Sequence, residues 1–166
     1  MRNFLFKLLL FLIIFAITGL IREYVFQTLN NLIYYKYYKT TSIPIPFGFV
    51  WLTRFSYVTL YYLKYPLTIV FVGIFYSLNL FFLKKFQVPS FYIRILTLSY
   101  LVLISLSILS MFYAYFFSQK LNDDEYLFSR GLMGIAQSPL IGFVLFVLYL
   151  WDKNKLQQHE KRNSNL

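Results

Sequence analysis

The stretch that decides the fold is RGLMGIAQSPLIGFVLFVLYLW, residues 130–151. It is long enough to cross a membrane, because about 20 apolar residues cover the hydrocarbon core of a bilayer. It begins at Arg130 and carries Gln137, Ser138 and Pro139 near its entrance, where apolar residues are the rule. The length predicts a membrane span, and the polar residues raise the question of what they contact.

The composition of the whole chain agrees with a membrane protein. Of the 166 residues, 59% are hydrophobic and 13% are charged, and the mean hydropathy is +0.60. Soluble domains carry roughly twice that share of charge. The chain has no cysteine, which excludes disulfides, thiolate metal sites and cysteine nucleophiles. The net charge of +10 comes from Lys and Arg scattered at the ends of apolar stretches, so we expect contacts with lipid headgroups and no nucleic-acid partner.

Four apolar stretches, at about 4–21, 65–83, 95–118 and 131–151, predict four membrane spans. The spans must be helices, because unpaired backbone is costly in lipid and the alternating pattern of a membrane barrel is missing. The sequence therefore predicts an all-α polytopic membrane protein. We expect a single transmembrane domain over residues 1–151, with an uncleaved first span, followed by a polar tail at 152–166.

The orientation follows from the distribution of Lys and Arg. The N-terminal side, the 84–94 loop and the tail carry nine of these residues, and the opposite side carries seven. Because cytoplasmic loops are enriched in positive charge, this bias predicts that both termini and the tail are cytoplasmic.

The segment 22–64 between the first two spans is too aromatic for a solvated loop. Its stretch IYYKYYKTTSIPIPFGFVWLTRF alternates tyrosines with Lys36 and Lys39, and Pro44 and Pro46 interrupt any continuous helix. We expect an interfacial segment whose rings lie at the lipid headgroups. The same pattern occurs in proteins that bind single-stranded nucleic acid, but four neighbouring spans favour the membrane.

Catalytic chemistry has few candidates in this sequence. His159 is the only histidine and lies in the polar tail, where a solvated role is expected because a lone histidine has no partner to act with. The acids Asp123, Asp124 and Glu125 occur together and predict a solvated turn, with a cation site as the alternative. We therefore expect no enzyme activity, no cofactor and no metal.

Small residues recur at intervals of four in the last two spans, and such stripes let helices approach closely in lipid. The residues are Ser110, Ala114 and Ser118 in the third span and Gly134, Ser138 and Gly142 in the fourth. They predict a hairpin of these two spans. Pro139 is tolerated in the first turns of its span if neighbouring groups bind the carbonyl that it frees at Ile135.

Arg130 and Gln137 are two helical turns apart and fall on one face with Gly134. Two interpretations stay open: Gln137 joins helices while Arg130 extends to phosphate, or the pair forms a contact site for a membrane partner or a lipid headgroup. Arg22 and Glu23 follow the first span on the same predicted side of the membrane. Because sequence neighbours point in different directions from a helix, we expect each of these two to pair elsewhere.

This layout resembles the small membrane proteins associated with exosortase systems in Bacteroidetes, the exosortase F system-associated family above all. The resemblance covers the arrangement of the whole chain and rests on Arg22, Arg130, Gln137 and Pro139. The family's Phe-Tyr-Asp-Pro signal has no counterpart here, because Tyr34-Tyr35-Lys36-Tyr37 lacks the acid and the proline. This difference favours a sister group that serves another exosortase type.

The resemblance implies a non-enzymatic accessory protein of the bacterial inner membrane that binds or stabilises an exosortase. The candidate contacts for that partner or for lipid are Arg22, Glu23, Arg130, Gln137 and Pro139. A small transporter or transporter assembly subunit is one alternative. A lipid-modifying or headgroup-binding protein that uses Arg22, Arg54 and Arg130 on phosphate is another.

Overall fold

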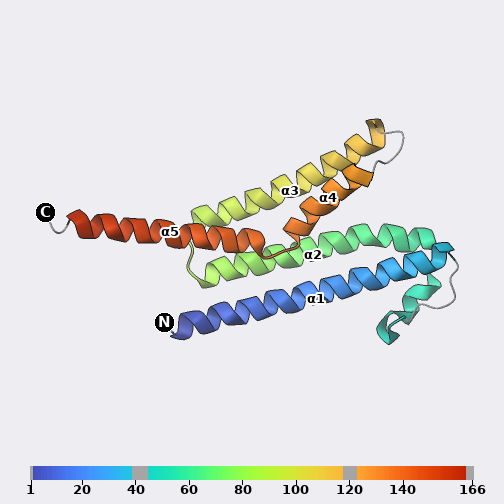
Figure 1. Ribbon diagram of the computed structural model, residues 1–166, viewed down its shortest axis with the longest axis horizontal. Coiled ribbons are helices and arrows are strands. Elements are labelled where there is room, and N and C mark those ends of the chain that lie inside the picture. The colour runs from blue at the N-terminus through green and yellow to red at the C-terminus, as the bar shows by residue number, and fades with distance from the viewer. Residues whose placement is uncertain (1, 39–44, 118–122, 164–166) are drawn as a thin grey trace. The chain divides into compact units, whose positions relative to one another are not determined.

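A computed structural model describes residues 2–38, 45–117 and 123–163, and within these ranges the chain is helical with no strand (Figure 1). The protein is an all-α polytopic membrane protein, as the sequence predicted. Three continuous helices have the length and apolar character of a span: Phe4–Tyr38, Tyr57–Lys85 and Ser90–Tyr113. The fourth candidate is a broken span made of Phe128–Ala136 and Leu140–Gln158, which meet at an angle of 56°.

The helices extend beyond the predicted spans at several ends. Helix α1 covers Arg2–Tyr38 and so includes the first part of the predicted interfacial segment, because residues 22–38 contain no glycine or proline that would end it. A 3₁₀ helix η1 follows at Phe47–Arg54, and α2 covers Tyr57–Lys85. Helices α3, α4 and α5 cover Ser90–Phe117, Asp123–Ala136 and Leu140–Asn163, so most of the predicted polar tail continues α5.

The internal contacts of the chain form two compact units, Met1–Gly73 and Ile74–Leu166, and the single transmembrane domain over residues 1–151 stays a prediction. The boundary falls inside α2, immediately after Gly73. Each unit has its own set of buried side chains and is described by itself.

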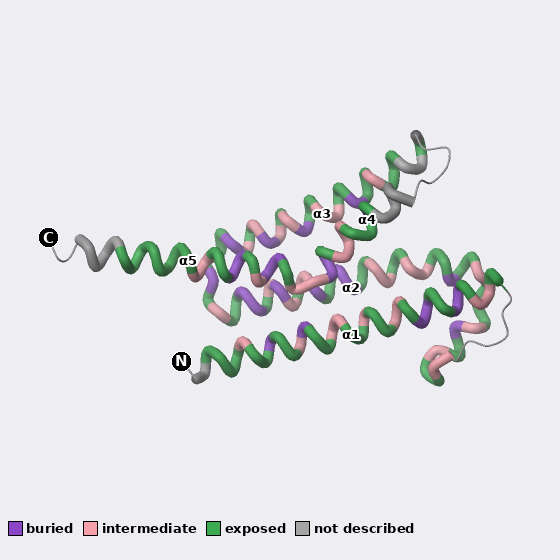
Figure 2. Tube along the Cα trace, viewed as in Figure 1, coloured by how far each residue is buried: buried purple, intermediate pink, exposed green. Residues whose placement is uncertain are grey.

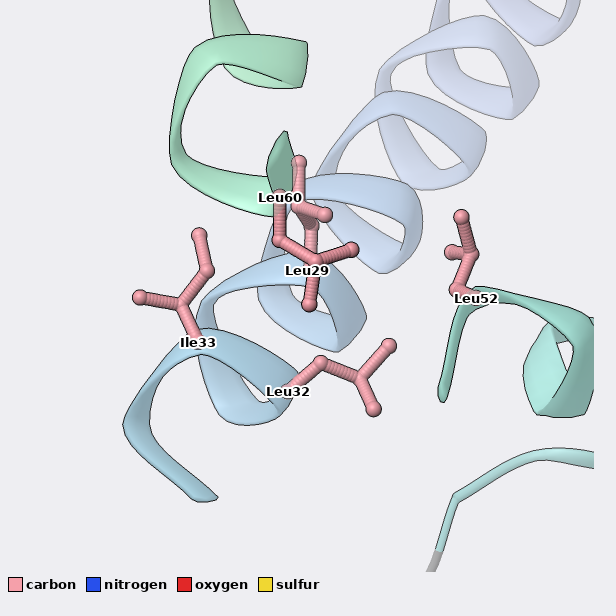
Figure 3. Packing of buried hydrophobic residues seen from close by; sticks show 5 residues of the cluster. All are labelled: Leu29, Leu32, Ile33, Leu52 and Leu60. Atoms are coloured by element: carbon pink, nitrogen blue, oxygen red, sulfur yellow. The ribbon is translucent and has the colours of Figure 1, made fainter. Parts of the chain in front are cut away.

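The first unit is held by a small apolar cluster. Leu29, Leu32 and Ile33 of α1 gather with Leu52 of η1 and Leu60 of α2, and all five side chains are buried (Figure 3). The Nζ atom of Lys36 also donates to the carbonyl of Thr53 at 2.7 Å. These contacts fix η1 against the C-terminal part of α1.

In the second unit, α2 turns into α3 through a short connection. The amide of Val88 donates to the Leu83 carbonyl and the amide of Gln87 donates to the Lys84 carbonyl, which is the pattern of a Schellman helix end. Gln87 adopts the left-handed conformation that this end requires, with φ 55°. The tight turn brings α3 back along the second half of α2.

Helices α3 and α4 lie side by side, which confirms the predicted hairpin for the first part of the broken span (Figure 1). The hydroxyl groups of Ser107 and Ser129 are hydrogen-bonded at 2.6 Å and both residues are buried. Most of the remaining surface of α3 is exposed, as Figure 2 shows, and its exposed residues are largely apolar. This is the surface expected of a helix that faces lipid.

Candidate functional site

The break between α4 and α5 consists of Gln137, Ser138 and Pro139. The hydroxyl of Ser138 donates to the carbonyl of Ile135 at 2.7 Å, and it accepts from the amide of Leu140 at 3.3 Å. The prediction that a neighbouring group binds the Ile135 carbonyl is therefore confirmed. Pro139 directly precedes α5, a position where its missing amide costs nothing, and its carbonyl accepts from the amide of Phe143 at 3.0 Å.

Asn79 of α2 contacts the backbone at this break. Its Nδ2 atom donates to the Ser138 carbonyl at 3.2 Å and to the Tyr100 hydroxyl of α3 at 3.0 Å. The Asn79 side chain is 0% exposed and Tyr100 is 3% exposed. One amide group thus joins α2 to α3 and to the carbonyl that the break leaves without a helical partner.

Gly142 lies against the other atom of the same amide. A Cβ atom added at Gly142 would stand only 2.0 Å from Asn79 Oδ1, so any other residue forces the Asn79 side chain to move. Oδ1 is buried and has no conventional hydrogen-bond partner within the described part of the chain. The glycine hydrogen that replaces a Cβ faces this oxygen, and weak Cα–H···O contacts of this kind recur where helices pack closely.

A second polar contact between α2 and α3 lies one turn away. The Tyr76 hydroxyl and Thr97 Oγ1 are 3.0 Å apart, and the rings of Tyr76 and Tyr100 meet edge to face with centroids 5.1 Å apart. Asn79 precedes Lys84 by five residues, which places it about 8 Å along the helix from the first lysine at that end of the span. If Lys84 marks the level of the headgroups, the polar cluster lies within the hydrocarbon region, where polar side chains turn inward and pair.

In the fourth span Gln137 is buried, and Gly134 has no close neighbour. Gln137 is only 4% exposed, so it does not share an exposed contact face with Arg130, which is exposed. The amide of Gln137 still donates to the Met133 carbonyl at 2.9 Å, so Gln137 keeps the register of α4, and its burial favours the interpretation in which it joins helices. Gly134 makes no close approach, since a Cβ there would meet nothing within 4 Å.

Of the three small residues predicted to pack in the third span, only Ser110 has a described side chain. Ser110 is half-buried, the side chain of Ala114 is not described, and Ser118 lies outside the described residues. Gly142, which the sequence assigned to packing between the last two spans, makes its close approach to Asn79 of α2. A polar contact between α3 and α4 is made by the Ser107–Ser129 pair described above.

Arg22 and Glu23 lie in the first unit, on α1. The Nη1 atom of Arg22 and Oε2 of Glu23 are 3.8 Å apart, so the expectation that each pairs elsewhere is wrong. The Arg22 guanidinium also lies 5.6 Å from the centroid of the Phe26 ring. Glu23 is largely exposed, and such surface pairs contribute little to stability.

Groups of acidic residues, histidines or cysteines that would hold a metal do not occur among the described residues. The side chains of His159 and of the three acids at 123–125 fall outside the description. At the break, amide, hydroxyl and carbonyl groups hydrogen-bond mainly with one another. This arrangement is typical of polar groups that hold helices together. Sequence reasoning missed Asn79, although an amide within the apolar stretch 65–83 is itself a signal of an inward polar contact.

No family model, no curated protein and no solved structure matches this chain. The class of protein is therefore defined by the fold alone, as a polytopic membrane protein with a broken candidate span.

Proposed function

We propose that this protein is a non-enzymatic accessory of an exosortase-type protein sorting system in the bacterial inner membrane. In this role it binds or stabilises a membrane partner. The resemblance at Arg22, Arg130, Gln137 and Pro139 suggests the partner, and the first unit suggests how it is bound.

The observation that carries the proposal is an exposed apolar surface on η1, which we call the η1 face. It consists of Phe47, Val50, Trp51 and Phe55, and Phe47 is 96% exposed. The face is fixed in place because Leu52, on the same element, is buried in the apolar cluster. Exposed apolar patches of this kind mark sites of protein or membrane interaction.

The length of α1 supports a contact outside the hydrocarbon. The helix has 37 residues and is about 55 Å long, whereas the hydrocarbon core is about 30 Å thick. If the apolar residues 4–21 fill the core, the part of α1 that carries η1 stands beyond it. The protein then presents the η1 face at one membrane surface, where the soluble part of a membrane enzyme is within reach.

The test is recovery of the tagged full-length protein from its native host in mild detergent, with the co-purifying proteins identified by mass spectrometry. The proposal expects an exosortase as the main enriched membrane partner. Phe47→Ser combined with Trp51→Ser should lower that enrichment at least about fivefold, as expected for loss of a central aromatic contact.

A matched control is Trp151→Ser, because Trp151 is 57% exposed and Trp51 is 55% exposed. This control should retain the partner. Recovery of the wild-type protein alone would overturn the proposal. An equal loss of partner enrichment in the Phe47→Ser, Trp51→Ser double variant and in Trp151→Ser would also overturn it.

A second candidate function, a small transporter or its assembly subunit, is favoured by the broken span, since transporters often build substrate sites at interrupted helices. The mutual hydrogen bonds of Asn79, Tyr100 and Ser138 weigh against it, because they occupy the groups that a substrate would need. Enrichment of transport subunits in place of an exosortase, in the same experiment, would favour this candidate.

A further inference from the structure

An apolar groove of about 450 Å³ lies in the second unit, between α3 and the two halves of the broken span. Leu98 and Val102 of α3 form one wall, and Leu140 and Val144 of α5 form the other. These four side chains are 47–61% exposed. The groove is therefore open along its length and offers an apolar surface to a long, flexible occupant.

The groove has the depth of one membrane leaflet. Its wall on α3 extends from Ile95 to Leu103, a rise of about 12 Å along the helix, and half of the hydrocarbon core is about 15 Å thick. The inner end lies at the break, where Ile135 and Leu140 contribute to the lining. The outer end lies near Arg94, where the turn from α2 into α3 reaches the headgroups.

Two cations flank this outer end. On α3, Arg94 precedes Leu98 by one helical turn and is exposed. On α5, the stripe that contains Val144 continues through Leu148 and Trp151 to Lys155, at intervals of four, three and four residues. Lys155 therefore lies on the extension of the wall that α5 contributes to the groove.

The two charges lie on either side of a contact that joins α3 and α5. The Tyr92 hydroxyl of α3 donates to the Asp152 carboxylate of α5, which ties the two helices together at the mouth. Arg94 lies two residues from Tyr92 on the side of the break, and Lys155 lies three residues from Asp152 on the opposite side. The ammonium of Lys155 lies 4.0 Å from the centroid of the Trp151 ring, so its charge is held one turn back toward the groove.

We propose that this groove binds an anionic phospholipid, with the phosphate held between Arg94 and Lys155 and one acyl chain lying in the groove as far as the break. Arginine forms paired hydrogen bonds with phosphate, and a basic side chain near the membrane surface attracts anionic lipid. Tryptophan is enriched at the level of the lipid headgroups. The Asp152 carboxylate keeps its negative charge but turns toward α3, where it accepts the Tyr92 hydroxyl, and the two cations outnumber it. The site is independent of the η1 face.

The test uses the fluorescence of Trp151 in the full-length protein. In a Trp51→Phe background Trp151 is the only tryptophan. The protein is reconstituted into phosphatidylcholine vesicles that contain a minor fraction of either brominated phosphatidylglycerol or brominated phosphatidylcholine. The ratio of the two quenching efficiencies, measured on the same variant, reports the preference for the anionic lipid and cancels any change in intrinsic emission.

The proposal expects brominated phosphatidylglycerol to quench more strongly, and Arg94→Gln and Lys155→Gln each to lower the preference about fivefold. Val102→Phe, which fills the groove without changing its charge, should lower it as well. The matched control is Lys153→Gln, which removes a charge from the opposite side of α5 and should leave the preference unchanged. Equal quenching by the two lipids would overturn the proposal, and so would an equal loss with Lys153→Gln, because general surface charge would then explain the binding.

Discussion

Both units of this protein bury apolar side chains, and in the second unit a buried side-chain amide also joins the helices. In the first unit, Leu29, Leu32 and Leu52 form an apolar cluster next to residues such as Gln27 and Asn31 that face outward. In the second unit, Asn79 joins the helices through its amide, and the backbone of Gly142 packs directly against it. The difference follows from the surroundings of each set of contacts.

Apolar burial stabilises a structure only where the alternative is water, because lipid is as apolar as leucine. The cluster of the first unit lies beyond the apolar stretch 4–21 of α1, in a part of the helix that carries charged and amide residues. Within the bilayer, close packing and polar contacts must replace the hydrophobic effect. Substitutions in the apolar cluster and at the polar contacts of Asn79 should therefore differ in their effects.

The largest effect is expected at Gly142. Gly142→Ala places a Cβ 2.0 Å from Asn79 Oδ1, so the amide must move and lose its hydrogen bonds. We expect a loss of about 3 kcal/mol in the free energy of unfolding. Gly134→Ala is the matched control, because nothing lies within 4 Å of its added Cβ, and alanine favours a helix there. Thermal unfolding in detergent micelles measures both, and equal effects would refute the close approach.

A smaller but clear effect is expected in the apolar cluster. Leu32→Ala removes a side chain that is 1% exposed, and a buried leucine replaced by alanine costs about 2 kcal/mol or more. The loss should be local, with faster hydrogen exchange in the amides of η1 and unchanged exchange in α5. Protection lost equally in both units would show that the two do not behave as separate structures.

Asn79→Leu should cost about 1 kcal/mol, the usual size of a polar contact between helices in a membrane. The substitution keeps the bulk of the side chain and removes the donors to Tyr100 and to the Ser138 carbonyl. Unfolding monitored by circular dichroism in the same micelles gives the value. Ser77→Ala, an exposed polar position on the same helix, provides the baseline, and a loss at Asn79 no larger than at Ser77 would contradict its role in joining the helices.

The smallest effect is expected for Lys36→Met, which removes the donor to the Thr53 carbonyl and retains the apolar stem. Because the bond is only partly buried, we expect a change below about 1 kcal/mol. The change should again appear as faster hydrogen exchange in η1. An effect larger than that of Leu32→Ala would mean that polar contacts, and not the apolar cluster, hold the first unit.

Most of the fold could be predicted from the sequence. The apolar stretches set the number and approximate place of the spans, because the thickness of a bilayer fixes the length of a helix that crosses it. The end of α1 could not be predicted in this way. Hydropathy falls at Arg22, but the helix continues to Tyr38 because neither glycine nor proline interrupts it.

The contacts at the break between α4 and α5 were predicted only in part. Gln137, Ser138 and Pro139 were recognised as unusual, and the capping of the Ile135 carbonyl followed from the chemistry of proline. The 56° bend did not follow, since a proline in the first turn of a helix also fits a straight span. Gly142 was recognised as a packing residue, but spacing within one helix does not reveal which other helix it meets.

The most direct test of the contact between the Asn79 amide and Gly142 is a double-mutant cycle between these two residues. Unfolding midpoints are compared for the wild type, for Asn79→Ala, for Gly142→Ala and for the double variant. If the amide closes the break against the glycine, the double variant is more stable than Gly142→Ala alone, because the shortened side chain vacates the space that the new Cβ needs. Simple addition of the two single losses would contradict the account.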